Sequence, residues 1–150
     1  MKHLFSLLVF LTGIFMTTAQ TKEETITWLK EKLKAYGQNA VRATNVTLKS
    51  IDECNIVVNY TSSSKDKMGK IQNIRFQEIL PTNIDRIVRS DESFPGHFVY
   101  REEAVVTTLV EDGYFINKSR TSSLRLNEES VSIPEVEKAI KHLATFCRKK

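Results

Sequence analysis

The sequence is short of the residues that build metal sites and disulfide-rich scaffolds. Its 150 residues include only two cysteines, three histidines and five glycines. No C-x-x-C or H-x-x-x-H spacing occurs, so the common zinc-binding patterns are missing. A G-x-S-x-G nucleophile motif and a glycine-rich phosphate loop are missing as well. We therefore expect no metal and no cofactor, and the common nucleotide-binding and hydrolase motifs do not apply.

The sequence also lacks a strong excess of charge of one sign. It contains 22 Lys and Arg residues against 18 Asp and Glu residues, which gives a formal net charge of +4. The basic residues are spread along the chain with acids between them, whereas a nucleic-acid-binding surface clusters Lys and Arg on one face. We predict a mildly basic surface and no nucleic-acid partner.

One long apolar run is present, at the N-terminus. Lys2 precedes the run Leu4–Met16, and small residues follow at positions 17–19. This order is typical of a secretory signal peptide, and the run is shorter than the roughly 20 residues of a membrane-spanning helix. We predict that residues 1–19 are a signal peptide and that the protein is periplasmic or secreted, with no integral membrane segment after cleavage. The remaining residues, 20–150, suffice for a single domain with one core.

Two amphipathic helices are predicted, one at each end of this domain. Apolar residues in Ser132–Lys149 recur at intervals of three and four, which places them on one helix face. Thr21 begins a second helix with the same periodicity, which extends to Tyr36. Each helix starts with a capping-box pattern, Thr21 with Glu24 and Ser132 with Glu135.

Between the helices, alternating apolar residues predict six or seven short strands. They lie near residues 42–50, 54–61, 71–80, 84–89, 98–110, 114–116 and 120–126. The polar run Ser62–Lys70 is predicted to be a flexible loop. Because no crossover helices separate these strands, their pairing is expected to be antiparallel. The predicted fold is α+β: an N-terminal helix, a six- or seven-stranded antiparallel curled sheet or partly open barrel, and a C-terminal helix packed on it.

The stretches IDRIVR (84–89) and PEVEKAIKHLATFC (134–147), in this order of elements, resemble the pleckstrin-homology-like barrel, which one C-terminal helix closes. More narrowly, the chain is similar to the small, uncharacterised exported bacterial proteins of that fold. The additional N-terminal helix departs from the minimal domain. A sheet wrapped around a helix, as in cystatin-like folds, is the alternative.

The two cysteines, Cys54 and Cys147, both fall on predicted inward faces. In an oxidising compartment they could form a disulfide between the last helix and the sheet, or remain separate buried thiols. A catalytic cysteine would need a nearby histidine. His142 lies five positions before Cys147, so the two side chains would point to different sides of a helix.

The segment Ser93–Tyr100 concentrates aromatic residues. Phe94, His97, Phe98 and Tyr100 are predicted to contact a ligand or partner, because aromatic residues on loops are favoured interface anchors. In the alternative interpretation, Phe94 or Phe98 fills the open end of the barrel.

Three functions remain open from the sequence. The leading hypothesis is an exported, non-enzymatic module that binds a protein, a peptide or an envelope component through a strand edge or the aromatic segment. The second is a small hydrolase or transferase that uses His97 and a nearby carboxylate such as Glu102. The third is a carrier of a small apolar ligand inside the barrel.

Overall fold

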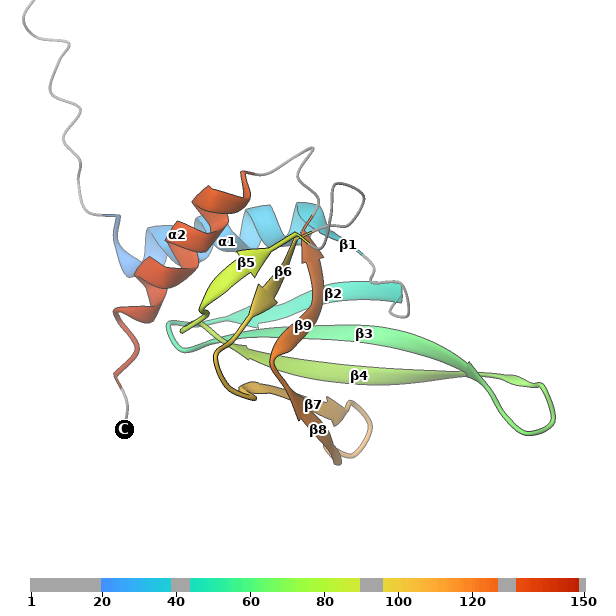
Figure 1. The fold of residues 1–150 in the computed structure, drawn as a ribbon. Coiled ribbons are helices and arrows are strands. Elements are labelled where there is room, and N and C mark those ends of the chain that lie inside the picture. Colours follow the sequence, from blue (N-terminus) through green and yellow to red (C-terminus); the bar gives the residue numbers. More distant parts are fainter. Residues whose placement is uncertain (1–19, 39–43, 90–95, 127–131, 149–150) are drawn as a thin grey trace, which may run out of the picture.

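The described residues fold into two helices and nine strands (Figure 1). This computed structural model describes residues 20–38, 44–89, 96–126 and 132–148. The elements in chain order are α1 (Lys22–Tyr36), β1 (Gly37–Gln38), β2 (Thr44–Ile51), β3 (Asn55–Lys65), β4 (Ile71–Pro81), β5 (Arg86–Val88), β6 (Gly96–Val99), β7 (Val105–Leu109), β8 (Phe115–Ser119), β9 (Thr121–Leu126) and α2 (Ile133–Ala144). None of the helices in the described ranges is both long and apolar enough to cross a membrane.

The strands form two antiparallel sheets. The large sheet has the order β2-β3-β4-β7-β8, and the small sheet has the order β1-β9-β6-β5. The predicted α+β class and antiparallel pairing are confirmed, but the strands in the described ranges do not close a barrel. The predicted strand near residues 98–110 is in fact two strands, because the chain leaves β6 at Tyr100 and enters β7 of the other sheet at Val105. This crossing joins the two sheets into one body.

Both predicted helices form, with differences at their ends. At α1, Thr21 and Glu24 make the predicted reciprocal capping bonds, at 2.8 and 3.2 Å. At α2, the Ser132 side chain makes no capping bond, and its backbone oxygen instead accepts the N–H of Glu135. The helix ends at Ala144, so Cys147 lies on the segment after α2 and not on its apolar stripe.

The two helices lie side by side (Figure 1), and the core combines buried residues of both helices and both sheets. Every third or fourth residue of α2 points into it, as the periodicity predicts. β6 approaches α2 closely at Gly96, where an added Cβ would lie 2.5 Å from Cδ1 of Ile133. The fully buried apolar residues, with no exposed surface, are Leu29, Ile56, Val58, Leu80, Phe98, Val105, Val136, Ile140 and Leu143.

A two-stranded ribbon extends from the large sheet (Figure 1). β3 and β4 stay paired as far as Lys65 and Ile71, whereas β2 pairs with β3 only up to Thr61 and β7 pairs with β4 only from Phe76. No third strand from the described residues pairs with residues 62–74, and we call them the arm. The prediction of a flexible loop at Ser62–Lys70 is therefore wrong for residues 62–65, which belong to β3 and pair with residues 71–74 of β4.

Candidate functional site

The structure places the predicted aromatic contacts mostly inside the molecule. Phe94 lies outside the described residues. Phe98 and Tyr100 are 0% and 4% exposed, and the Tyr100 hydroxyl donates a hydrogen bond to the oxygen of Pro81 at 2.9 Å. The segment is a strand at Gly96–Val99 and not a loop, so alternate residues face the core. Phe98 and Tyr100 are therefore core residues that a partner cannot reach.

His97 points to the other face of β6, next to Arg125. Its position is opposite Arg125 on β9, and burial together with the Arg125 charge lowers the pKa of the imidazole. The Nδ1 atom is buried without a hydrogen-bond partner in the described part of the chain. Glu102 lies instead on an exposed loop, in a pocket with Asp85 and Lys141. None of the interactions of the described residues joins His97 to Glu102.

Glu78 is the buried carboxylate that the sequence did not indicate. It lies on β4, is 3% exposed, and accepts hydrogen bonds from the Ser123 backbone N–H at 2.8 Å and the Ser123 hydroxyl at 2.6 Å. These bonds link the large sheet to β9 of the small sheet. Burial raises the pKa of Glu78, and the Ser123 bonds and the charge of Arg125 only partly offset it. The sequence signal for this burial is the alternation of β4, which places Glu78 on the same strand face as the buried Leu80.

The raised pKa of Glu78 predicts a pH-dependent stability. Because the folded state holds the Glu78 proton more tightly, the contribution is complete below the unfolded pKa and is lost as the pH rises through the folded pKa. We expect the unfolding free energy of the wild type, relative to Glu78→Gln, to decrease as the pH rises from about 4 to 8. Urea unfolding at several pH values measures it, with Glu102→Gln as the matched control. A relative stability that increases with pH would mean that Ser123 and Arg125 outweigh burial.

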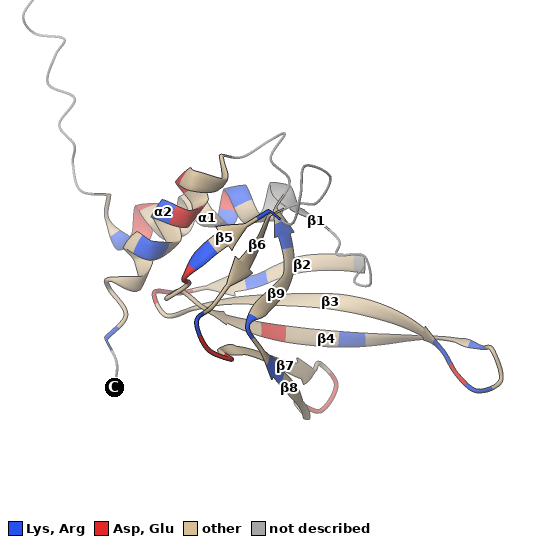
Figure 2. Ribbon diagram, viewed as in Figure 1, with Lys and Arg blue, Asp and Glu red and all other residues tan. Residues whose placement is uncertain are grey.

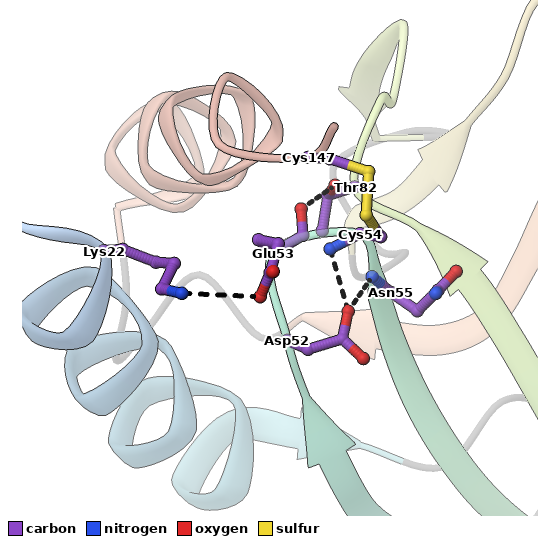
Figure 3. Close-up of a disulfide and its surroundings, with 7 residues drawn as sticks. All are labelled: Lys22, Asp52, Glu53, Cys54, Asn55, Thr82 and Cys147. Carbon is purple, nitrogen blue, oxygen red and sulfur yellow. Dashed lines mark hydrogen bonds and ion pairs between the residues drawn. A yellow bond between two sulfur atoms is a disulfide. The ribbon is translucent and has the colours of Figure 1, made fainter. Parts of the chain in front are cut away.

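The cysteines form a disulfide at the base of the helix pair (Figure 3). The Cα atoms of Cys54 and Cys147 lie 4.9 Å apart, and the bond connects the segment after α2 to the β2–β3 turn. Asp52 shapes that turn, since its Oδ1 accepts the N–H groups of Cys54 and Asn55 at 2.8 and 2.7 Å. The disulfide thus confirms one of the two interpretations left open, and its neighbours give it a structural role.

Three further contacts fasten the same corner. The Thr82 hydroxyl donates to the Glu53 oxygen at 2.7 Å, and the Glu53 carboxylate lies 3.8 Å from Nζ of Lys22 on α1 (Figure 3). His142 on α2 lies 2.7 Å from the oxygen of Gln20 through its Nε2 atom. No cluster of three or more potential metal ligands occurs among the residues whose placement is described. The Lys22–Glu53 pair joins α1 to the β2–β3 turn, and the His142 contact joins α2 to the segment before α1.

Two of the sheet edges are covered by helices. At β5, the N–H of Ile87 donates to Oε2 of Glu137 on α2 at 2.8 Å, so a side chain replaces the missing strand. Burial raises the pKa of Glu137, but hydrogen bonds from Lys141 and Ile87 outweigh it and the pKa is lowered. At the other sheet, β2 packs against α1 and has two register irregularities. Covering, charge and bulges are the usual means of blocking unwanted strand pairing.

The edge strand β8 is different, because large apolar side chains lie exposed on it. Tyr114, Phe115 and Ile116 are consecutive in the chain and are 66%, 52% and 41% exposed. Among the described strands, β8 pairs only with β7, and a register irregularity falls between Thr107 and Thr108, opposite Ile116. We call residues 114–119 the β8 edge. An exposed edge with adjacent apolar side chains is able to pair with a further strand.

No protein-family model matches this chain, and no curated protein or solved structure matches it either.

Proposed function

We propose that this protein is an exported, non-enzymatic binding module that accepts an extended polypeptide segment along the β8 edge. The observation that carries the proposal is the run of three exposed large apolar residues at the start of β8, an edge strand that none of the other described elements covers. Strand addition would satisfy the free backbone groups of β8, and the side chains of Tyr114, Phe115 and Ile116 would supply apolar contact area. The partner is then a protein or peptide and not a small molecule.

Export is supported by two features. The N-terminal segment has the order of a secretory signal peptide, and the Cys54–Cys147 disulfide requires an oxidising compartment to persist. The pleckstrin-homology-like relationship also belongs to the proposal. A C-terminal helix packed over antiparallel strands supports it, whereas two sheets that do not close depart from it.

The two other hypotheses have less support. An enzyme based on His97 and Glu102 would need the two side chains in one cleft. His97 instead lies beside Arg125, whereas Glu102 lines a pocket that His97 does not line. A carrier of an apolar ligand would need space between the sheets, where Ile56, Val58 and Phe98 are packed with no exposed surface.

Site-specific photo-crosslinking in the producing cells tests the proposal. A benzophenone side chain at Tyr114 is expected to capture a polypeptide, because this position borders the open edge. The double variant Phe115→Lys, Ile116→Lys should abolish the adduct, since lysines on an edge strand oppose strand pairing. The matched control places the same side chain at Lys30, on the exposed face of α1. Equal adducts at both positions, or an adduct that survives the double variant, would contradict the proposal.

A further inference from the structure

The peptide group between Gln20 and Thr21 is hydrogen-bonded through both its oxygen and its N–H. The Gln20 oxygen lies 2.7 Å from Nε2 of His142 on α2, and because a carbonyl oxygen only accepts, Nε2 is the donor. The N–H of Thr21 donates to Oε2 of Glu24 at 2.8 Å, within the capping box of α1. This one peptide group therefore joins the start of α1 to the last turn of α2.

These two bonds favour Gln20 as the first residue of the exported chain. The predicted signal peptide ends at residue 19, so its removal leaves the Gln20–Thr21 peptide group and both of its hydrogen bonds intact. Removal of one more residue would delete the oxygen that His142 binds and would turn the Thr21 N–H into a terminal amine. The first residue that these contacts need is thus the one that follows the predicted signal peptide.

We propose that the mature chain starts at Gln20 and that this residue cyclises to pyroglutamate, an inference that rests on the proposed export. The free α-amine attacks Cδ of its own side-chain amide, so that a bond between the α-nitrogen and Cδ forms. The bond from Cδ to the amide nitrogen breaks, and that nitrogen leaves as ammonia with the proton that the amine gives up. The step needs no oxidant, reductant or second substrate, and it removes the terminal charge. Gln38, Gln72 and Gln77 lack a free α-amine, so the modification is confined to this site.

The surroundings of Gln20 leave the reacting atoms free. Gln20 is exposed and borders a hollow of about 1240 Å³, together with Phe146 and Cys147 from the end of the chain. Among the described residues, the hydrogen bond of Gln20 is the one from His142, which engages the backbone oxygen. Cyclisation uses the α-nitrogen and the side-chain amide instead, so the backbone oxygen remains available to His142. The hollow gives the five-membered ring room beside that bond.

The charges around this hollow do not require a terminal amine. Both helices carry acids and bases close together (Figure 2). The two acids that line the hollow, Glu23 and Glu53, pair with Nζ of Lys22 at 3.6 and 3.8 Å. The remaining ionisable residues of the lining are the bases Arg148 and His142. A free ammonium group at the N-terminus would therefore meet no unpaired acid in this lining, and its conversion to a neutral ring breaks none of these ion pairs.

Intact-mass spectrometry of the protein that the producing cells export tests the inference. We expect the mass of residues 20–150 with the Cys54–Cys147 disulfide, lowered by the mass of one ammonia molecule. Edman degradation should give no sequence, because the ring leaves no free α-amine. In the matched control Gln20→Asn, the amide lies one carbon closer to the backbone, where closure would require a strained four-membered ring. That variant should show its full mass and give a sequence that begins with asparagine and continues with Thr21.

The possible results separate this inference from the proposed function. A wild-type chain that begins at Gln20 with a free amine, or that begins at a later residue, would overturn the inference and leave export intact. Loss of ammonia from the Gln20→Asn variant would overturn it too, because the change would then lie at another residue. A chain that retains residues 1–19 would remove both this inference and export. The β8 photo-adduct is measured separately and does not depend on the N-terminus.

Discussion

Replacement of both Cys54 and Cys147 by serine should lower the free energy of unfolding by about 3–5 kcal/mol. The disulfide joins residues that are 93 positions apart, so it closes a loop that includes most of the domain. Loss of the bond returns conformational freedom to the unfolded chain, and chain-entropy arithmetic gives the upper end of this range. In the folded state it also frees the segment after α2 from the β2–β3 turn.

Urea unfolding monitored by circular dichroism measures this effect. The wild type in reducing buffer should unfold at the same midpoint as the double variant in either buffer, because both have lost the same covalent link. The double variant itself should be insensitive to reductant. If the oxidised and reduced wild-type proteins unfold at the same urea concentration, the disulfide does not stabilise the fold.

Substitution of Phe98 by alanine should cost about 3–5 kcal/mol, as for other fully buried aromatic residues. Phe98 has no exposed surface, and its backbone N–H donates to the buried Ser122 hydroxyl at 3.1 Å. The alanine would leave a cavity next to the small sheet. By contrast, Phe115→Ala should cost no more than about 1 kcal/mol, because that side chain is 52% exposed.

The two alanine variants, together with the double lysine variant of β8, separate effects on folding from effects on binding. Thermal unfolding should show a large decrease in Tm for Phe98→Ala and a small one for Phe115→Ala, whereas the β8 photo-adduct should be lost in the Phe115→Lys, Ile116→Lys variant. Similar Tm values for both alanine variants would mean that the core tolerates the loss of Phe98. A partner lost in Phe98→Ala alone would report unfolding and not a contact of that side chain.

The elements that the sequence predicted well are those with a strong local signal. The capping residues Thr21 and Glu24 fixed the start of α1, and the apolar positions of α2 proved to be the buried ones. The strand near residues 71–80 was predicted within one residue of β4. These features depend on contacts between residues that are close in the chain, so a short window contains the information.

The predictions that failed depended on pairing at a distance. The serines at positions 62–64 have the composition of a loop, yet they continue β3 because Gln72 and Asn73 pair with them, and the Ser63 hydroxyl bonds to Asn73 at 2.6 Å. The strand predicted from residue 98 begins two residues earlier, at Gly96, where β6 needs close contact with Ile133.

The sequence by itself determined which elements this protein has: two amphipathic helices and a series of antiparallel strands. It did not place the two cysteines, which lie in the β2–β3 turn and after α2 rather than on the inward faces of a strand and a helix. Only the tertiary structure decided which edges are covered. Glu137 reaches β5 across 50 residues and α1 packs against β2, while β8 keeps Tyr114 and Phe115 at the surface. The physical reason is that hydrogen bonding to an edge and burial of a side chain are set by neighbours in space, which periodicity does not specify.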